Sequence, residues 1–184
     1  MSDLLLLVAF VAAVNPPRSR LALPDQGAGR PRPLVVVIGS VGAVAVIAGL
    51  AGASAPVLDA VEVTPETFRI AAGLVAVLAG GWAFVFPLPT SEPPLRGWRA
   101  GIWPVAYPLI LAPEVLLLAI AGGTQNGAVG TTAAAVSAIA ALGLLGLVPS
   151  RGTAPRVLAA AGRVLAGLLV VVGIFLMIDG IRDV

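Results

Sequence analysis

Long apolar stretches alternate with short polar or Pro/Gly-rich links along the whole chain. Each stretch is close to the ~20 residues that an α-helix needs to cross about 30 Å of hydrocarbon. The pattern predicts an all-α integral membrane protein: a single transmembrane domain over residues 1–184 with six transmembrane helices. The expected spans cover residues 3–23, 34–57, 67–87, 101–121, 128–148 and 158–180.

The first span is the least regular. Leu4 to Val14 is apolar, but Asn15-Pro16-Pro17-Arg18 interrupts it. A signal-peptide core is a poor fit, because Asp3 stands where a basic flank belongs and no small-residue cleavage site follows. We interpret the stretch as an interrupted span, and a short re-entrant or interfacial helix is the alternative.

The links between spans carry ordinary loop and helix-start signals. Residues 26–33, 87–94 and 149–153 are rich in the Pro and Gly that interrupt helices, and none is long enough for a soluble domain. Thr64-Pro65-Glu66 is typical of a helix start, with a capping hydroxyl, a proline in the first turn and an acid at the positive end of the helix dipole.

Composition supports the membrane class and excludes several chemistries. Hydrophobic residues make up 59% of the chain and charged residues 11%, against about a quarter charged in soluble domains. Lysine, histidine and cysteine are all absent, which removes disulfides, thiolate chemistry and imidazole bases or metal ligands. No basic run is interleaved with aromatic residues, so nucleic acid is not an expected partner. We expect no metal, no cofactor and no catalytic residue.

The arginines predict an orientation. Nine of the 11 lie in or beside the links that follow spans one, three and five, whereas Arg69 and Arg182 lie at the other ends of their spans. The positive-inside rule makes those three links cytoplasmic and puts both termini outside the cell membrane. The nine are Arg18, Arg20, Arg30, Arg32, Arg96, Arg99, Arg151, Arg156 and Arg163.

The fourth span contains Pro108, Pro113 and Glu114 within an otherwise apolar sequence. Proline breaks or kinks a helix, and the freed backbone groups in lipid need protein or water as partners. Three interpretations of Glu114 remain open: a carboxylate that exchanges a coupling proton or cation, a structural ion pair with Arg18 or Arg20, or a span that ends before it.

The two halves of the chain resemble each other. Pro16 lies twelve residues after Leu4 and Pro113 eleven after Ile102, which puts both breaks about 16–18 Å along their spans. Phe68 is followed by Arg69-Ile-Ala-Ala-Gly-Leu, which is similar to Arg163-Val-Leu-Ala-Gly-Leu. We interpret residues 1–94 and 95–184 as a 3+3 inverted-topology repeat, whose paired broken helices mark the substrate site of secondary transporters. Chance similarity in an Ala/Gly/Leu-rich chain is the alternative.

The stretch from Trp103 to Pro113, the Phe68–Gly73 segment, Asn15-Pro16 and Asp179-Gly180 resemble the MarC family of six-span membrane proteins, which is grouped with the LysE-type transporters. The resemblance covers most of the chain. It implies transport of small solutes, with neutral amino acids associated with some members. The chain departs from the family where Ala112 and Glu114 replace glycines and where Pro17, Arg18 and Arg20 follow Asn15-Pro16.

The predicted substrate or ion site lies between the two breaks. Asn15 either orients a zwitterion or ion with its amide, or only satisfies backbone groups at its own kink. Arg18 is expected to meet Glu114 or a substrate carboxylate, Arg20 to extend to the interface, and Arg69 to pair with Glu66, Glu62 or Asp59. The site residues are Asn15, Pro16, Pro108, Ala112, Pro113 and Glu114, with Arg18 as partner.

A small-solute secondary transporter in a lipid bilayer is the first functional hypothesis. An intramembrane enzyme acting on lipids needs a cluster of acids, histidines or a metal site that the deep residues do not supply. A non-transporting subunit or scaffold of a larger membrane complex is the third hypothesis. Small-residue faces such as Gly73-x-x-x-Val77 suit packing within one protomer or in a homo-oligomer.

Overall fold

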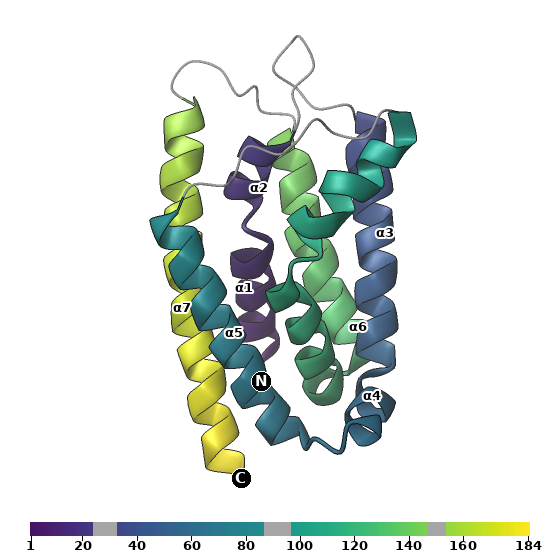
Figure 1. The fold of residues 1–184 in the computed structure, drawn as a ribbon, viewed down its shortest axis with the longest axis vertical. Coiled ribbons are helices and arrows are strands. Elements are labelled where there is room, and N and C mark those ends of the chain that lie inside the picture. Colours follow the sequence, from purple (N-terminus) through teal and green to yellow (C-terminus); the bar gives the residue numbers. More distant parts are fainter. Residues whose placement is uncertain (24–32, 87–96, 147–153) are drawn as a thin grey trace.

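The computed structural model describes residues 1–23, 33–86, 97–146 and 154–184, and within these ranges every regular element is a helix. Five stretches of helix are long and apolar enough to cross a membrane, which fits a multi-pass membrane protein. Figure 1 shows them as a bundle elongated along one axis. The elements are α1 (Asp3–Val14), α2 (Pro16–Ala22), α3 (Pro33–Gly52), α4 (Ser54–Ala60), α5 (Pro65–Val85), η1 (Gly97–Gly101), η2 (Ile102–Ile110), α6 (Pro113–Gly146) and α7 (Ala154–Asp183).

Helix α1 lies at the centre of the bundle, between α5 and α7 on one side and α3 and α6 on the other (Figure 1). Its Leu6 and Phe10 side chains are fully buried and join Leu118 and Leu142 in one apolar cluster. A helix that is apolar all round is expected in such a position, because none of its faces needs water.

The first span is broken where the sequence predicted. Helix α1 ends at Asn15, whose backbone is left-handed (φ 45°), and α2 begins at Pro16. Asparagine tolerates this conformation better than most residues, and proline fits the first turn of the helix that follows. The two pieces together run from Asp3 to Ala22 and count as one span.

The interruption predicted at Ala112-Pro113 is also confirmed, and it is wider than expected. The preceding segment, η2, is a π-helix with extended backbone angles at Trp103 and Tyr107, and the Tyr107–Pro108 peptide is cis. Leu111 and Ala112 lie between η2 and α6, and Pro113 begins α6. Predicting one span over residues 101–121 missed this irregular first half.

Helix α6 consists of two helical limbs joined at a kink, which lies in the link predicted between spans four and five. Its 34 residues continue through the expected link and bend at Gly127 (φ 73°, ψ 166°), a conformation that only glycine adopts readily. A Cβ on Gly122 would lie 2.9 Å from Thr131 Oγ1, so the segments before and after Gly127 run back alongside each other. Figure 1 shows these two limbs of α6. The predicted link over residues 122–127 is therefore shorter than expected, because the chain reverses at Gly127 alone.

Helices α5 and α7 form the most extensive helix pair of the described residues. They run antiparallel, and Gly73 and Gly173 meet where they cross. A Cβ on either glycine would lie 2.6 Å from the carbonyl oxygen of the other. Glycine lets the two backbones approach this closely, as small residues do in membrane helix pairs. The predicted small-residue face at Gly73 and Val77 therefore packs within the protomer.

The contacts on either side of this crossing are related by a constant shift. Gly80 lies against the carbonyl oxygen of Ala166, and Gly180 lies against that of Glu66, at 2.7 and 2.9 Å from the ideal Cβ positions. Each contact becomes the other when residue i of α5 is exchanged with residue i+100 of α7. The similar Arg69 and Arg163 motifs are 94 residues apart, so the structure pairs Gly73 with Gly173 rather than with the Gly167 of the second motif.

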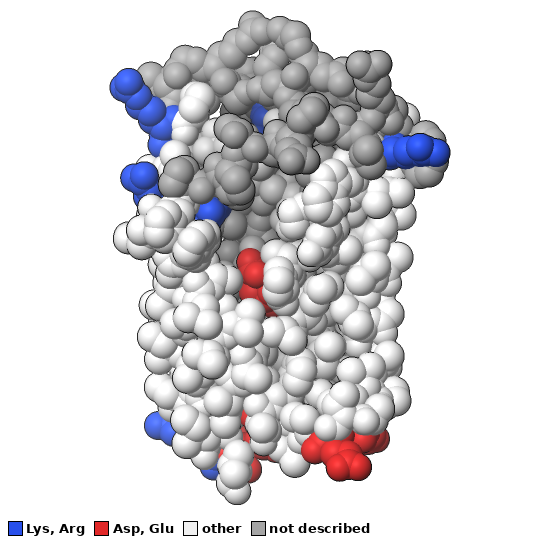
Figure 2. All heavy atoms as spheres, viewed as in Figure 1, with Lys and Arg blue, Asp and Glu red and all other residues white. Residues whose placement is uncertain are grey.

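The two ends of the bundle carry opposite charges (Figure 2). We call the end with Arg99, Arg156 and Arg163 the arginine end, and the end with Asp3, Asp59, Glu62, Asp179 and Asp183 the acidic end. Arg69 and Arg182 also belong to the acidic end, as the sequence predicted for these two. Four other arginines of the predicted cytoplasmic links, Arg30, Arg32, Arg96 and Arg151, lie outside the described residues.

Candidate functional site

The two helix breaks line one cavity of about 280 Å³. Figure 2 shows a hollow in the side of the bundle with acidic atoms inside it, and Glu114 is the acid of the cavity lining. Five of the predicted site residues lie on its wall: Asn15, Arg18, Pro108, Ala112 and Glu114. Pro16 and Pro113 do not line it.

Both prolines act on the cavity through the backbone. Each is the first residue of the helix that follows a break, α2 for Pro16 and α6 for Pro113. This position suits proline because its missing N–H has no partner to lose there. Glu114 therefore lies in the first turn of α6, where the helix dipole favours a negative charge.

Asn15 uses its side-chain amide to hold the break together. Its Nδ2 donates to the carbonyl oxygen of Gly162 on α7 at 2.8 Å, and its Oδ1 accepts from the backbone N–H of Arg18 at 3.3 Å. A Cβ on Gly162 would lie 3.1 Å from the Arg18 side chain, so α7 approaches α2 closely here. These contacts match the interpretation in which Asn15 satisfies backbone groups at its own kink. A ligand could bind only the lone pairs and the one amide proton that these contacts leave.

Arg18 and Glu114 bring opposite charges to the cavity without forming a salt bridge. The Arg18 Nη2 donates to the carbonyl oxygen of Phe86 at 3.2 Å, at the end of α5. Arg18 and Glu114 are both half-buried and close enough for their charges to attract. Within the described ranges Glu114 makes no ion pair with Arg18 or Arg20. Most of the hydrogen-bonding capacity of both groups is therefore available to a ligand.

The expectation for Arg20 is wrong. Its side chain is 0% exposed, so it does not extend to the interface as a flexible surface arginine would. It follows Ser19, which is also buried and donates from its hydroxyl to the carbonyl oxygen of Val14 at 2.7 Å. Helix α2 thus turns its polar side chains inward, and its Ser19 contributes to the cavity wall.

Sequence reasoning missed the contribution of α5 and α7 to the cavity. Trp82 and Ala79 line it from α5, and Ala166 and Leu169 line it from α7. These side chains resemble those that face lipid, so no polar signal separates the cavity side of either helix from its outer side. The Trp82 indole, 63% exposed, is the one feature that stands out within its span.

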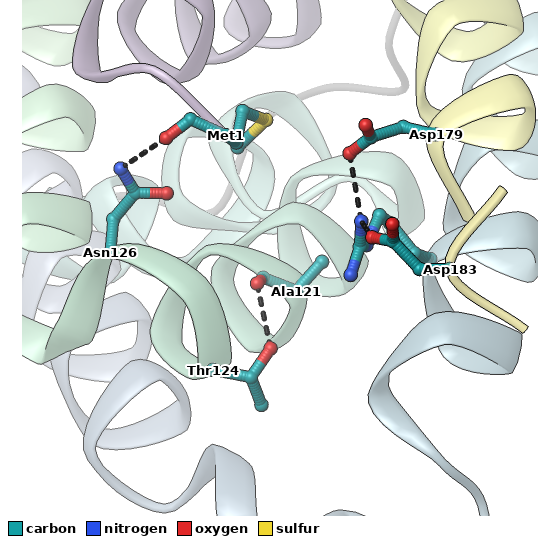
Figure 3. A network of polar contacts seen from close by, with 7 residues as sticks. Met1, Ala121, Thr124, Asn126, Asp179 and Asp183 are labelled. Carbon is teal, nitrogen blue, oxygen red and sulfur yellow. Dashed lines mark hydrogen bonds and ion pairs between the residues drawn. The ribbon is translucent and has the colours of Figure 1, made fainter.

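A second polar cluster lies at the acidic end (Figure 3). The Arg69 Nη1 donates to Asp179 Oδ2 and Asp183 Oδ2 at 2.7 Å each, so its partners come from α7 and not from the predicted Glu66, Glu62 or Asp59. The antiparallel pairing of α5 and α7 explains the difference, because it brings the end of α7 to the start of α5. Asn126 Nδ2 donates to the Met1 carbonyl oxygen at 2.9 Å in the same region.

The described residues offer no group of three or more acidic, histidine or cysteine side chains that could hold a metal ion. Among these residues the cavity presents the Arg18 guanidinium, the Glu114 carboxylate, the polar side chains of Asn15 and Ser19, and mostly apolar walls. Comparison of the chain with protein-family models, with curated proteins and with solved structures gave no match.

Proposed function

We propose that this chain is a secondary transporter of the cell membrane that moves small zwitterions, such as neutral amino acids. One observation carries the proposal: Arg18 and Glu114 line one cavity beside two helix breaks, and they are not paired with each other. A guanidinium binds a carboxylate and a carboxylate binds an ammonium group, so the two together suit a molecule that bears both. The mostly apolar rest of the cavity suits an uncharged side chain.

The 3+3 inverted arrangement with six spans belongs to the same proposal. In it, η2 and the first limb of α6 together form the fourth crossing, the second limb forms the fifth, and the other four long stretches supply one each. The antiparallel packing of α5 and α7, the third span of each proposed half, is compatible with an inverted pair. In transporters of this kind, broken helices near the midplane form the substrate site.

Alternating access is supported by the unequal packing of the broken spans. Helix α1 packs along α6 toward the acidic end, whereas α2 and η2 hardly touch toward the arginine end among the described residues. In this proposal the arginine end is cytoplasmic, both termini are outside, and the structure corresponds to a state closed on the outer side. A proton or cation that binds Glu114 as the site alternates would supply the coupling. The resemblance to the MarC family agrees with this function.

Counterflow of radiolabelled neutral amino acids in proteoliposomes tests the proposal. We expect saturable flux that Glu114→Gln and Arg18→Gln each reduce by at least tenfold, because a charge-assisted hydrogen bond contributes about 1.5–3 kcal/mol. The matched controls are Glu62→Gln and Arg163→Gln, which neutralise exposed charges outside the cavity. Absence of any solute flux, together with a stably copurifying protein, would instead favour the non-transporting subunit.

A further inference from the structure

Among the described residues, the helices around the cavity leave one of its sides open. Its described lining residues come from α1, α2, α5, η2, α6 and α7 and from the breaks at Asn15 and Ala112. Among the described residues α5 and η2 make hardly any contact with each other. Figure 2 shows the hollow on the long side of the bundle, which is the surface that lipid covers when the helices cross a membrane.

Aromatic side chains flank this side opening on both walls. Trp82 and Phe86 of the α5 region stack with ring centroids 4.2 Å apart, and Trp103 and Tyr107 of η2 lie 5.5 Å apart. All four are well exposed, and Trp82 itself lines the cavity. Tryptophan and tyrosine favour the boundary between headgroups and hydrocarbon, because each combines an apolar ring with a polar N–H or O–H group.

The size of the cavity limits what it encloses. Its volume of about 280 Å³ lies at the lower edge of the ~300–1,000 Å³ that pockets for drug-sized ligands occupy. A charged head with an ammonium and an anionic group fills such a space, whereas a hydrocarbon chain attached to that head does not fit and has to leave through the opening. The Arg18 guanidinium, held by the Phe86 carbonyl oxygen on the α5 side, lies where it can bind the anionic group.

We propose that the cavity admits its ligand sideways from the bilayer and binds amphiphiles with a zwitterionic, ammonium-bearing head, whose tail stays between α5 and η2. Arg18 binds the anionic group of the head and Glu114 the ammonium group. This inference rests on the proposed site and extends its ligands from small zwitterions to zwitterions that carry an apolar tail.

Binding of lysophosphatidylethanolamine to the purified protein in nanodiscs tests the inference, with phosphoethanolamine as the tail-free probe. We expect the lipid to bind at least tenfold more tightly than phosphoethanolamine. With the same acyl chain, we also expect at least tenfold weaker binding of lysophosphatidylglycerol, which lacks the ammonium group, and of lysophosphatidylcholine, whose ammonium has no N–H to donate. The chain-matched lipids control for partition into the bilayer, since all three share one tail.

A variant of the opening separates sideways entry from simple binding to the head. Ala83→Trp adds an indole to the cavity wall on α5, and Leu78→Trp adds the same group to an exposed position of α5 outside the lining. We expect Ala83→Trp to weaken binding of the lipid at least tenfold and Leu78→Trp to leave it within twofold.

Equal affinity for phosphoethanolamine and the lipid, or equal binding of the three chain-matched lipids, would overturn the inference. If tail-free amino acids are still transported in that case, the proposed transport function stands. If the lipid binds in a tail-dependent way but no solute flux is measured, only the proposed transport function is overturned.

Discussion

Gly73 of α5 and Gly173 of α7 occupy the space that each other's Cβ atom would need. A methyl group on either residue would lie 2.6 Å from the carbonyl oxygen of the other, closer than any stable contact. Because the two distances are equal, the crossing is symmetric, and the two helices depend on it to the same degree.

Alanine at either glycine is therefore expected to destabilise the protein by a similar amount. Gly73→Ala and Gly173→Ala each force the helices apart, which costs about 1–3 kcal/mol for an overpacked contact. Gly42→Ala is the control, since a Cβ there meets nothing within 4 Å. Thermal unfolding in detergent measures the effect. A loss confined to one of the two glycines would contradict the symmetric crossing.

The position of the Gly73–Gly173 crossing does not follow from the two similar sequence motifs. The Arg69 and Arg163 motifs are similar in letters and 94 residues apart, yet the two glycines that meet at the crossing, Gly73 and Gly173, are 100 residues apart. Packing depends on which face of each helix carries the small residues, and in this chain glycine and alanine are frequent on every face. A motif of such residues is therefore a weak guide to which positions correspond.

Local signals in the sequence predicted helix starts and breaks more reliably than the similar motifs predicted helix packing. Thr64 caps α5 as predicted, accepting from the Thr67 N–H at 3.3 Å, and both helix breaks lie at the predicted prolines. Proline and a capping hydroxyl act on neighbouring backbone groups, so their effect is determined by adjacent residues. The partners of Arg69 and the cavity position of Trp82 depend on helices distant in sequence, which no local rule supplies.

The Arg69 cluster is expected to hold the ends of α5 and α7 together. Arg69→Gln leaves Asp179 and Asp183 as close carboxylates without their shared cation, and the arginine side chain is only 7% exposed. We expect a loss of about 1–3 kcal/mol, below that of a fully buried pair because both aspartates reach solvent. Asp183→Asn, at a side chain 51% exposed, should cost less than ~1 kcal/mol.

Unfolding of these variants and of an Asp59→Asn control, measured at low and high salt, tests the assignment. Asp59 is exposed and was one of the partners expected from sequence, so its replacement should change stability by less than about 0.5 kcal/mol. If Asp59→Asn destabilises the protein as much as Arg69→Gln, the α7 aspartates are not the main partners of Arg69.

Asn15 is expected to be a structural requirement of the first break. Asn15→Ala removes the donor to the Gly162 carbonyl oxygen and the acceptor for the Arg18 N–H, and it puts alanine at φ 45°. The left-handed conformation costs a non-glycine residue about 1–2 kcal/mol, so Asn15→Gly should be the milder replacement by roughly that amount. Asn15→Asp keeps the acceptor and loses the donor, and its effect separates the two hydrogen bonds. Equal stability of the alanine and glycine variants would show that the backbone strain is relieved by movement of α2.

The proposed roles of Arg18, which binds the carboxylate, and Glu114, which binds the ammonium group, can be tested with analogues of one amino acid that each lack one charge. The amide of the amino acid lacks the carboxylate, and the N-acetyl derivative lacks the ammonium group. In competition with flux, we expect the native protein to discriminate against both by at least tenfold, which corresponds to about 1.4 kcal/mol for each charge-assisted contact. Arg18→Gln should lose discrimination against the amide only, and Glu114→Gln against the N-acetyl derivative only.

This crossed pattern is specific to direct contact with the ligand. A purely structural role for either side chain would lower flux of all three compounds together and leave their ratios unchanged. A reversed pattern would assign the ammonium group to the neighbourhood of Arg18, which Coulomb repulsion opposes. The ratios between compounds, rather than the absolute rates, therefore decide whether the two opposite charges of the cavity recognise the two ends of one ligand.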